Sequence, residues 1–408
     1  MIASAAGTGV PATLSPDEAA RVPWSTIVIG SGPAGTAVAI RLARAGRRIL
    51  LVDRESMPRP KVCGCCLSSR ALVELRGLGC ATDDRGRLLG AMPLDRVRLV
   101  AAARTVTLPL PVGGTLSRES LDAALVRTAI AAGAAWLPWS HVTGVAEPCG
   151  PPPCVTVTCR AAAGAVFSLR ADCAVIATGL ADHVRVPGSA PRTIEPGSRI
   201  GVGTTLAASS IDLPTGELVM AIGRGGYCGI VRLEDGRIDV AAAVDRRQLA
   251  ASETIGAAVA EVLREAAGPA PWVSAVRAAL ADAAMQATPP LTRSAGTMAG
   301  FYGRVLRVGD AAGYVEPFTG EGMGWALTGG RLAAEALLTA SSPATAYGRS
   351  FTAFARRHHR RCRRLATALR HPRLVGAAIR VAAATPTVAA ALVPMLVGMT
   401  TLSGEPSP

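Results

Sequence analysis

Lysine and asparagine are almost absent from this sequence. Its 408 residues include one lysine, Lys61, and no asparagine, so arginine supplies nearly all of the positive charge behind a formal net charge of +14. Such a bias is typical of a GC-rich coding sequence. Aromatic residues make up 3% of the chain, which leaves few side chains for stacking on bases. We therefore discount the basic balance and predict no nucleic-acid partner.

Signals for export and for a disulfide framework are also missing. The first 23 residues have no basic start and no continuous apolar stretch, so we expect a cytoplasmic protein. Ten cysteines in a cytoplasmic chain of this length are expected to be free thiols. No second pair of cysteines or histidines stands at ligand spacing, which argues against a metal site.

The length exceeds that of a single ordinary core, and half of the residues are apolar. We expect a packed globule of two intertwined domains followed by a tail.

A glycine-rich turn stands near the N-terminus. Residues 26–35 read TIVIGSGPAG, an apolar β-branched run that breaks at Gly30, Gly32 and Gly35 and continues as an alanine-rich helical pattern. The next strand pattern, RRILLVD, ends at Asp53, where a carboxylate can accept hydrogen bonds from a ribose. This strand, turn and helix predict a dinucleotide site with its pyrophosphate at the helix N-terminus. Further candidate contacts are Ser31, Pro33, Ala34 and Arg54.

A second segment of the same site is predicted far along the chain. A short strand at 304–308 runs into Gly309 and Asp310, within RVLRVGDAAGYVEPFTGEGMGWALTGGRLAAEAL. This resembles the flavin-contacting segment of the FAD-dependent family that includes p-hydroxybenzoate hydroxylase, geranylgeranyl reductases and flavin-dependent halogenases. The resemblance implies FAD as the cofactor, with Asp310 on the ribityl chain. It also implies that residues 317–323, including Gly322 and Met323, present N–H groups to the isoalloxazine, where they would stabilise the reduced flavin.

Two more segments agree with this family in part. The helix pattern at 116–133 matches the family's arginine-led helix, which implies that Arg118 lies against the cofactor. The strand pattern at 171–179 ends in Thr178 and Gly179, where hydroxylases of the family usually carry an Asp-Gly pair. We keep both residues as cofactor contacts. The missing aspartate argues against direct NADPH binding. The electron donor is therefore left open, with NAD(P)H kept as one candidate for the external reductant.

Three cysteines crowd one loop, MPRPKVCGCCLSSRAL, which resembles the KxCG loop of geranylgeranyl-reductase-like flavoproteins. Three interpretations remain open. The cysteines are small apolar packers, or Cys63 is a catalytic residue beside the flavin, or Cys63 and Cys66 form a redox-active pair with CxxC spacing.

The remaining segments favour a substrate chamber. Residues 91–112 and 199–245 alternate in short strand patterns that predict a sheet over the flavin. The family's isoprenoid reductases carry YxWxFP there, of which Tyr227 survives while Gly229 replaces the tryptophan, and this departure weakens an isoprenoid assignment. The halogenase motif WxWxIP is missing and the lone lysine lies in the cysteine loop, which argues against halogenation. Tyr227, Arg232 and Glu321 are the polar candidates for substrate binding or proton transfer, with Tyr227 and Glu321 as catalytic candidates.

The C-terminal segment is basic and then apolar. Residues 355–373 read ARRHHRRCRRLATALRHPR, and an apolar stretch interrupted by Arg380, Pro386 and Pro394 follows. A spanning helix is not expected. Peripheral contact with an anionic membrane at the inner face is one hypothesis, and a helical tail that packs on the protein or caps the chamber is the alternative.

Together these patterns predict an α/β fold with a Rossmann-like FAD-binding domain of the glutathione-reductase type, an inserted mixed β-sheet domain and a helical tail. We assign residues 22–90, 113–185 and 297–345 to the FAD domain, 91–112 and 186–296 to the substrate domain, and 346–408 to the tail.

The leading functional hypothesis is a monooxygenase of secondary metabolism that hydroxylates a small apolar substrate, aromatic or polyketide-like. The alternative is a reductase or dehydrogenase of a carbon–carbon double bond in an isoprenoid or lipid. A third hypothesis is a non-catalytic, redox-responsive flavin module that uses Cys63 and Cys66.

Overall fold

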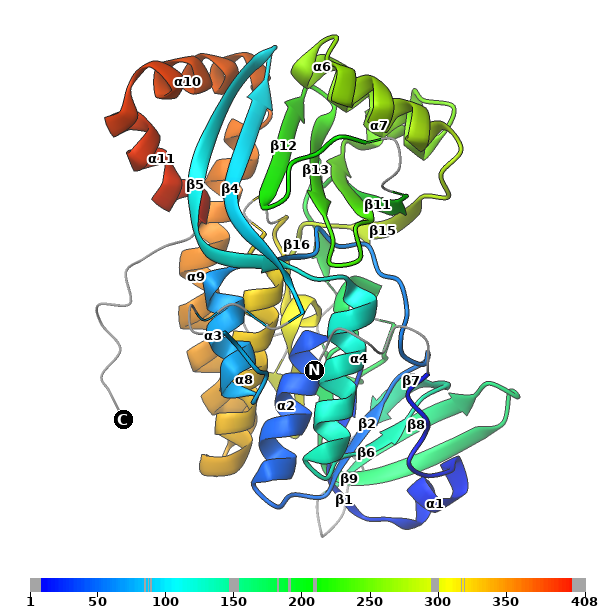
Figure 1. Ribbon diagram of the computed structural model, residues 1–408. Coiled ribbons are helices and arrows are strands. Elements are labelled where there is room, and N and C mark those ends of the chain that lie inside the picture. The colour runs from blue at the N-terminus through cyan, green and yellow to red at the C-terminus, as the bar shows by residue number, and fades with distance from the viewer. Residues whose placement is uncertain are drawn as a thin grey trace.

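The computed structural model describes residues 9–83, 86, 88, 90–146, 154–181, 183–189, 192–207, 211–294, 301–316, 318 and 320–397. Figure 1 shows two lobes, each built on its own sheet. A parallel-sheet lobe lies at the bottom of the view, and a second sheet with its own helices lies at the top. The C-terminal helices run along one side of both lobes.

Within the described parts of the chain, eight strands form the sheet of the first lobe. Its path runs β17–β18–β9–β1–β2–β6, and β8 and then β7 extend it from β9. The pairings among β18, β9, β1, β2 and β6 are parallel. Continuous apolar runs such as residues 49–52 are fully buried because both faces of this sheet are covered. The bounds are β1 Trp24–Ile29, β2 Ile49–Val52, β6 Ala135–Leu137, β7 Ser140–Ala146, β8 Val155–Ala161, β9 Val166–Ile176, β17 Phe301–Tyr302 and β18 Val305–Arg307.

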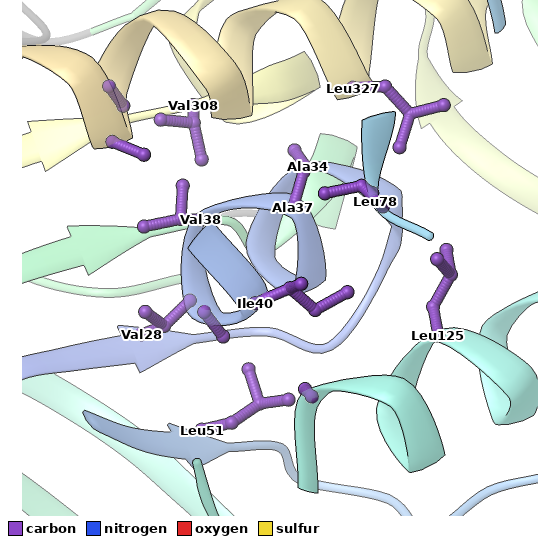
Figure 2. Close-up of a cluster of buried hydrophobic side chains, with 14 of the residues drawn as sticks. Val28, Ala34, Ala37, Val38, Ile40, Leu51, Leu78, Leu125, Val308 and Leu327 are labelled. Carbon is purple, nitrogen blue, oxygen red and sulfur yellow. The ribbon is translucent and has the colours of Figure 1, made fainter. Parts of the chain in front are cut away.

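One helix of the first lobe is buried nearly all round. Helix α2 (Pro33–Arg44) contacts both α8 (Gly322–Thr339) and α4 (Arg118–Ala131). Figure 2 shows Ala34 and Val38 of α2 facing Val308 and Leu327, with Leu125 of α4 on another side. The approach to α8 is close, because a Cβ at Gly330 would lie 2.5 Å from the carbonyl oxygen of Ala34. Smaller elements of this lobe are α1 Pro16–Arg21, α3 Ser69–Gly77 and the 3₁₀ turns η1 Gly179–Ala181 and η3 Gly309–Ala312.

The second sheet has the order β15–β11–β14–β13–β12–β4–β5–β3. It is mixed, because β12 and β4 pair in parallel while its other pairings are antiparallel. Valines and alanines of α6 pack on one face of it, and the opposite face looks toward the first lobe. The bounds are β3 Cys66–Leu67, β4 Met92–Ala101, β5 Arg104–Thr115, β11 Ile200–Leu206, β12 Glu217–Gly223, β13 Gly226–Arg232, β14 Ile238–Val244, β15 Gln286–Pro290, α5 Arg246–Ala250, α6 Ile255–Ala267 and α7 Pro271–Ala281. A separate two-stranded ribbon pairs β10 Thr193–Ile194 with β16 Arg293–Ser294.

Three helices end the described chain: α9 Pro343–Ala368, α10 Pro372–Ala384 and α11 Pro386–Val397. Helix α9 packs along α8, and α10 lies against the β4–β5 hairpin. Gly376 allows this contact, since a Cβ there would lie 3.0 Å from the carbonyl oxygen of Ala101. Among the residues that the structure describes, we find no helix whose length and apolarity suffice to span a bilayer.

The predicted fold class is confirmed: a Rossmann-like parallel sheet, a separate mixed sheet and C-terminal helices are all present. The domain limits drawn from the sequence stay a prediction.

Candidate functional site

A cavity of about 510 Å³ lies between the two lobes. On the side of the first lobe its walls come from separate stretches of the chain: the glycine turn, the end of β2, the cysteine loop, the start of α4, the start of β7, the segment after β9, and residues 308–326. The inward face of the second sheet closes it. Most of the residues predicted for the site line this one cavity: Gly30, Gly32, Pro33, Ala34, Asp53, Arg54, Cys63, Arg118, Thr178, Gly179, Tyr227, Gly309, Asp310, Gly322 and Met323.

The glycine turn has the geometry that its sequence predicts. Gly30 has φ +105°, and a Cβ there would lie 2.5 Å from the carbonyl oxygen of Ala177. A Cβ at Gly35 would lie 1.9 Å from the carbonyl oxygen of Gly30, so only glycine fits either position. The N-terminus of α2 lines the cavity without a side-chain cap, and the first N–H groups of a helix have no partner within the helix.

Ser31 and Gly35 support the turn and do not line the cavity. The backbone N–H and the hydroxyl of Ser31 donate to Asp53 Oδ2, at 2.8 and 2.7 Å. Arg59 donates to the same oxygen at 3.1 Å. These contacts fix the carboxylate in the cavity wall at the end of β2.

Three charged side chains converge on the middle of the cavity. Burial lowers the pKa of Lys61 and raises the pKa of Asp310, and the attraction between their charges opposes both shifts. Arg118 forms a bidentate ion pair with Asp122 and also hydrogen-bonds the Cys63 sulfur. Asp310 therefore faces two cations.

The cysteine loop carries one acidic thiol. A hydrogen bond from Cys65 and the nearby Arg118 cation lower the pKa of Cys63 to about 6, against the opposing effect of burial. The thiol of Cys66 donates to the carbonyl oxygen of Gly64 at 3.0 Å, and burial raises its pKa. The nine cysteines that the structure describes are free thiols.

Tyr227 is held in the cavity wall by contacts with two side chains. The Arg199 guanidinium lies 5.4 Å from its ring centroid, and Phe318 meets it edge-on at 5.1 Å. Arg199 is fully buried and donates to Glu316 at 2.9 Å. Burial raises the pKa of Tyr227, so its hydroxyl stays protonated at neutral pH.

Two of the predicted polar candidates lie outside the cavity lining. Glu321 is buried and accepts from Trp325 Nε1 at 3.1 Å. Arg232 donates to carbonyl oxygens of the loop before β12, including that of Leu213 at 3.0 Å. Pro317 and Thr319, from the predicted flavin-facing stretch, lie outside the described residues.

Comparisons with known proteins agree with this geometry. A family model described as pyridine nucleotide-disulphide oxidoreductase matches residues 24–231. The chain belongs to this family. It is a FAD-dependent oxidoreductase, as the sequence resemblance predicted.

The relatives of this flavoprotein carry out different reactions. Menaquinone reductase of Mycolicibacterium smegmatis is 29% identical over 372 residues, which cover 86% of this chain and 85% of the relative. A geranylgeranyl bacteriochlorophyll reductase-like protein of Thermoplasma acidophilum has a TM-score of 0.68 at 16% identity, covering 92% and 97% of the two chains. The flavin-dependent brominase Bmp2 has a TM-score of 0.73 at 18% identity, covering 92% and 94%. At these identities the structural likenesses show a shared fold.

The residues of the cavity fit FAD. The Gly30 turn and the α2 N-terminus suit a pyrophosphate, and Asp53 stands where a ribose would be bound. Gly309 lets its segment of the backbone lie close to the start of α2, because a Cβ there would lie 2.9 Å from Ala34 Cβ. The bound flavin would supply hydride transfer or oxygen activation, and the chain supplies binding and electrostatics.

Two residues that line the cavity, Lys61 and Tyr314, had no individual role in the sequence interpretation. For Lys61 a signal existed, because a single lysine in an arginine-rich chain stands inside a flavoprotein loop motif. For Tyr314 no local pattern indicates a position in the cavity wall, because that wall forms only when the two lobes meet.

Proposed function

We propose that this flavoprotein reduces a carbon–carbon double bond in a long apolar substrate of isoprenoid type. The observation that carries the proposal is an apolar side chamber of about 50 Å³ that adjoins the FAD cavity. The two share the lining residues Cys66, Leu218, Met220, Phe318 and Gly320. The far wall of the side chamber is aliphatic and consists largely of Leu94, Val97, Leu99, Leu110 and Val112.

An aliphatic side chamber favours a flexible hydrocarbon chain over a compact aromatic molecule, because the chain gains free energy from each methylene it buries. Gly229 adds room at the junction. It stands across from Met220 on the neighbouring strand, and a Cβ there would lie 3.1 Å from the Met220 sulfur. The replacement of the family's tryptophan by Gly229 thus widens the chamber. The full-length relative named menaquinone reductase supports a lipid quinone or a similar isoprenoid lipid as the substrate class.

The test is anaerobic reoxidation of the photoreduced protein. A polyprenyl lipid or menaquinone should reoxidise the flavin in the absence of oxygen and yield a product with two more hydrogen atoms. Mass spectrometry of the side chain separates reduction of a chain double bond from reduction of the quinone ring. Flavin that stays reduced with every such lipid would contradict the proposal.

Hydroxylation of a small apolar molecule is the second candidate. The fold favours it, since PqsL of Pseudomonas aeruginosa, described as a probable FAD-dependent monooxygenase, has a TM-score of 0.66 to this chain. Oxygen uptake that depends on the substrate and gives a hydroxylated product would move the assignment to this candidate. Whether NAD(P)H or another reductant supplies the electrons is tested by its rate of flavin reduction.

We extend the proposal to a peripheral membrane contact through α10, because such a lipid is stored in a bilayer. Leu374 and Val381 are 69% and 51% exposed, and each follows an exposed arginine, Arg373 and Arg380. No aspartate or glutamate occurs between Glu335 and Glu405. An apolar helix face flanked by arginines is attracted to anionic lipid.

Co-sedimentation with vesicles tests the membrane contact. The protein should pellet with phosphatidylglycerol vesicles at low salt, less at high salt, and not with phosphatidylcholine. Arg373→Gln with Arg380→Gln should weaken pelleting, whereas Arg160→Gln with Arg170→Gln on the distant β8–β9 hairpin should not. A protein that stays in the supernatant at every salt concentration would remove the contact.

A further inference from the structure

A polar side chamber of about 260 Å³ adjoins the cysteine loop. It shares Lys61, Cys63, Cys65 and Arg118 with the FAD cavity, so residues 60–65 form a wall common to both spaces. Its other polar lining residues are Glu119, Thr204, Thr205, Arg237 and Asp239, and Gln286 lines both spaces. Arg237 is 39% exposed, so this chamber leads toward solvent.

Asp239 is a buried acid on the inward face of the second sheet. It pairs with Val231 on one side and with Thr205 on the other, and Ala241 follows it on the same face. The residue is 6% exposed, and its Oδ2 atom has no hydrogen-bond partner among the described residues. A buried carboxylate oxygen without a partner costs free energy, so a functional reason for this residue is expected.

The electrostatics connect Asp239 to Cys63. Burial raises the pKa of Asp239 well above its ordinary range, and the charge of Cys63 raises it further, while a hydrogen bond with Cys65 opposes both effects. Cys65 lines the same chamber as both groups: its backbone N–H donates to Cys63 Sγ at 3.4 Å, and its thiol donates to the Cys63 carbonyl oxygen at 3.8 Å. The charge of Asp239 contributes to the raised pKa of the Cys65 thiol. The other titratable groups around Asp239 are Lys61, Cys66, Arg118, Glu119, Cys228 and Arg237.

We propose that Asp239 is the proton reservoir of the Cys63 thiol and exchanges its proton with Cys63 through Cys65. This rests on the proposed reduction of a double bond, for which a bound flavin would supply the hydride to one carbon, so that an acid of the protein must give a proton to the other. Cys63 breaks its S–H bond to protonate that carbon. Cys65 returns a proton to the Cys63 thiolate and takes one from Asp239, which regains a proton from water in the polar chamber.

The arrangement explains why an acidic thiol serves as the donor. A thiol with a pKa of about 6 gives up its proton readily but is mostly thiolate at neutral pH, so it needs a neighbour that stays protonated. Asp239 is such a neighbour, because burial raises its pKa and favours its protonated form. Cys63 is then a catalytic residue and Asp239 a proton-supplying residue behind it.

The test is the pH profile of Cys63 alkylation in the full-length protein with FAD bound and no substrate. Iodoacetamide modifies thiolates, and cleavage after Lys61 and Arg70 releases residues 62–70, in which fragmentation separates Cys63 from Cys65 and Cys66. In the wild type, Cys63 should react in two steps, the first near pH 6 and the second at higher pH, because coupled groups titrate jointly. Asp239→Asn should leave a single step.

Matched variants separate a proton exchange from a packing effect. Asp239→Glu keeps an acid and should keep both steps, and so should Glu119→Gln, which removes another acid of the same chamber. Cys65→Ser should alter the Cys63 profile, whereas Cys66→Ser should not. The Cys65→Ser variant also provides a test if Asp239→Asn does not fold.

Two outcomes would overturn the proposal: an Asp239→Asn profile equal to that of the wild type, or a Cys63 profile that Cys65→Ser leaves unchanged. Because the readout needs no substrate, it stands apart from the outcome of the reductase test.

Discussion

Arg118 and Asp122 form a bidentate ion pair one turn apart on α4, with Nε–Oδ1 and Nη2–Oδ2 distances of 3.0 and 2.6 Å. Both side chains are almost fully buried, and the same guanidinium hydrogen-bonds the Cys63 sulfur. Arg118 therefore affects two properties: the stability of α4, through its ion pair, and the pKa of the Cys63 thiol in the cavity.

Arg118→Gln is expected to lower the free energy of unfolding by about 3–5 kcal/mol, because it leaves Asp122 buried without its partner. The double variant Arg118→Gln with Asp122→Asn should lose less, since no uncompensated charge remains. Urea unfolding of both variants measures this difference. Equal losses in the two would show that the pair is not coupled.

The same substitution should raise the pKa of Cys63 above about 6, because it removes a cation that favours the thiolate. Alkylation of Cys63 in the double variant, followed across pH, checks the direction. A midpoint that does not rise would mean that the Cys65 hydrogen bond sets the acidity alone.

Gly30→Ala should abolish FAD binding. The position has φ +105°, and the new Cβ would overlap the backbone at Ala177. Gly46→Ala is the matched control, because Gly46 has φ +74° but no atom lies within 4 Å of its added Cβ. The control should cost about 1–2 kcal/mol of stability from strain alone and should keep its FAD. The ratio of flavin to protein absorbance in the purified variants measures this difference, and a Gly30→Ala protein that keeps its FAD would contradict the prediction.

A large side chain at position 229 should reduce the length of the apolar chain that the chamber accepts. An indole side chain at this position would fill the space beside Met220 and Leu218, so Gly229→Trp should raise KM for long apolar chains and leave the FAD content unchanged. Gly229→Ala should have a small effect, because its Cβ meets the flexible end of Met220. Long chains that are turned over equally by both variants would place the substrate elsewhere.

Acid should weaken the packing of α9 on α8. Burial, helped by nearby arginines such as Arg70, lowers the pKa of His358 to about 4, and its ring lies 5.3 Å from that of Trp325. A histidine with a lowered folded pKa adds stability above its unfolded pKa of about 6.5, and that stability is lost as the pH falls toward 4.

His358→Phe should therefore reduce the difference in urea midpoint between about pH 7.5 and about pH 5. His371→Gln, which changes an exposed histidine at the start of α10, should leave this difference as it is. A His358→Phe protein as acid-sensitive as the wild type would assign the effect to other groups.

Local sequence determined much of this protein. The Gly30 turn can be predicted from the sequence because its φ of +105° and its contact with the backbone at Ala177 exclude any side chain. Only glycine meets that requirement, so the sequence pattern records it. Buried runs such as residues 49–52 predict parallel strands because both sheet faces are covered. The alternating strand patterns likewise predicted a second sheet over the flavin, and the mixed pairing of that sheet agrees with the predicted fold class.

Only the tertiary structure decided which side chains share a space. Glu321 and Tyr227 were equal candidates in the sequence, but Glu321 turns to Trp325 while Tyr227 faces the cavity. In the sequence, Asp239 is an ordinary polar residue of an alternating strand. In the structure, β14 brings it to the same chamber as the cysteine loop, which lies more than 170 positions earlier in the chain. The burial and electrostatic coupling that make it chemically distinctive are long-range in sequence, and no local pattern records them.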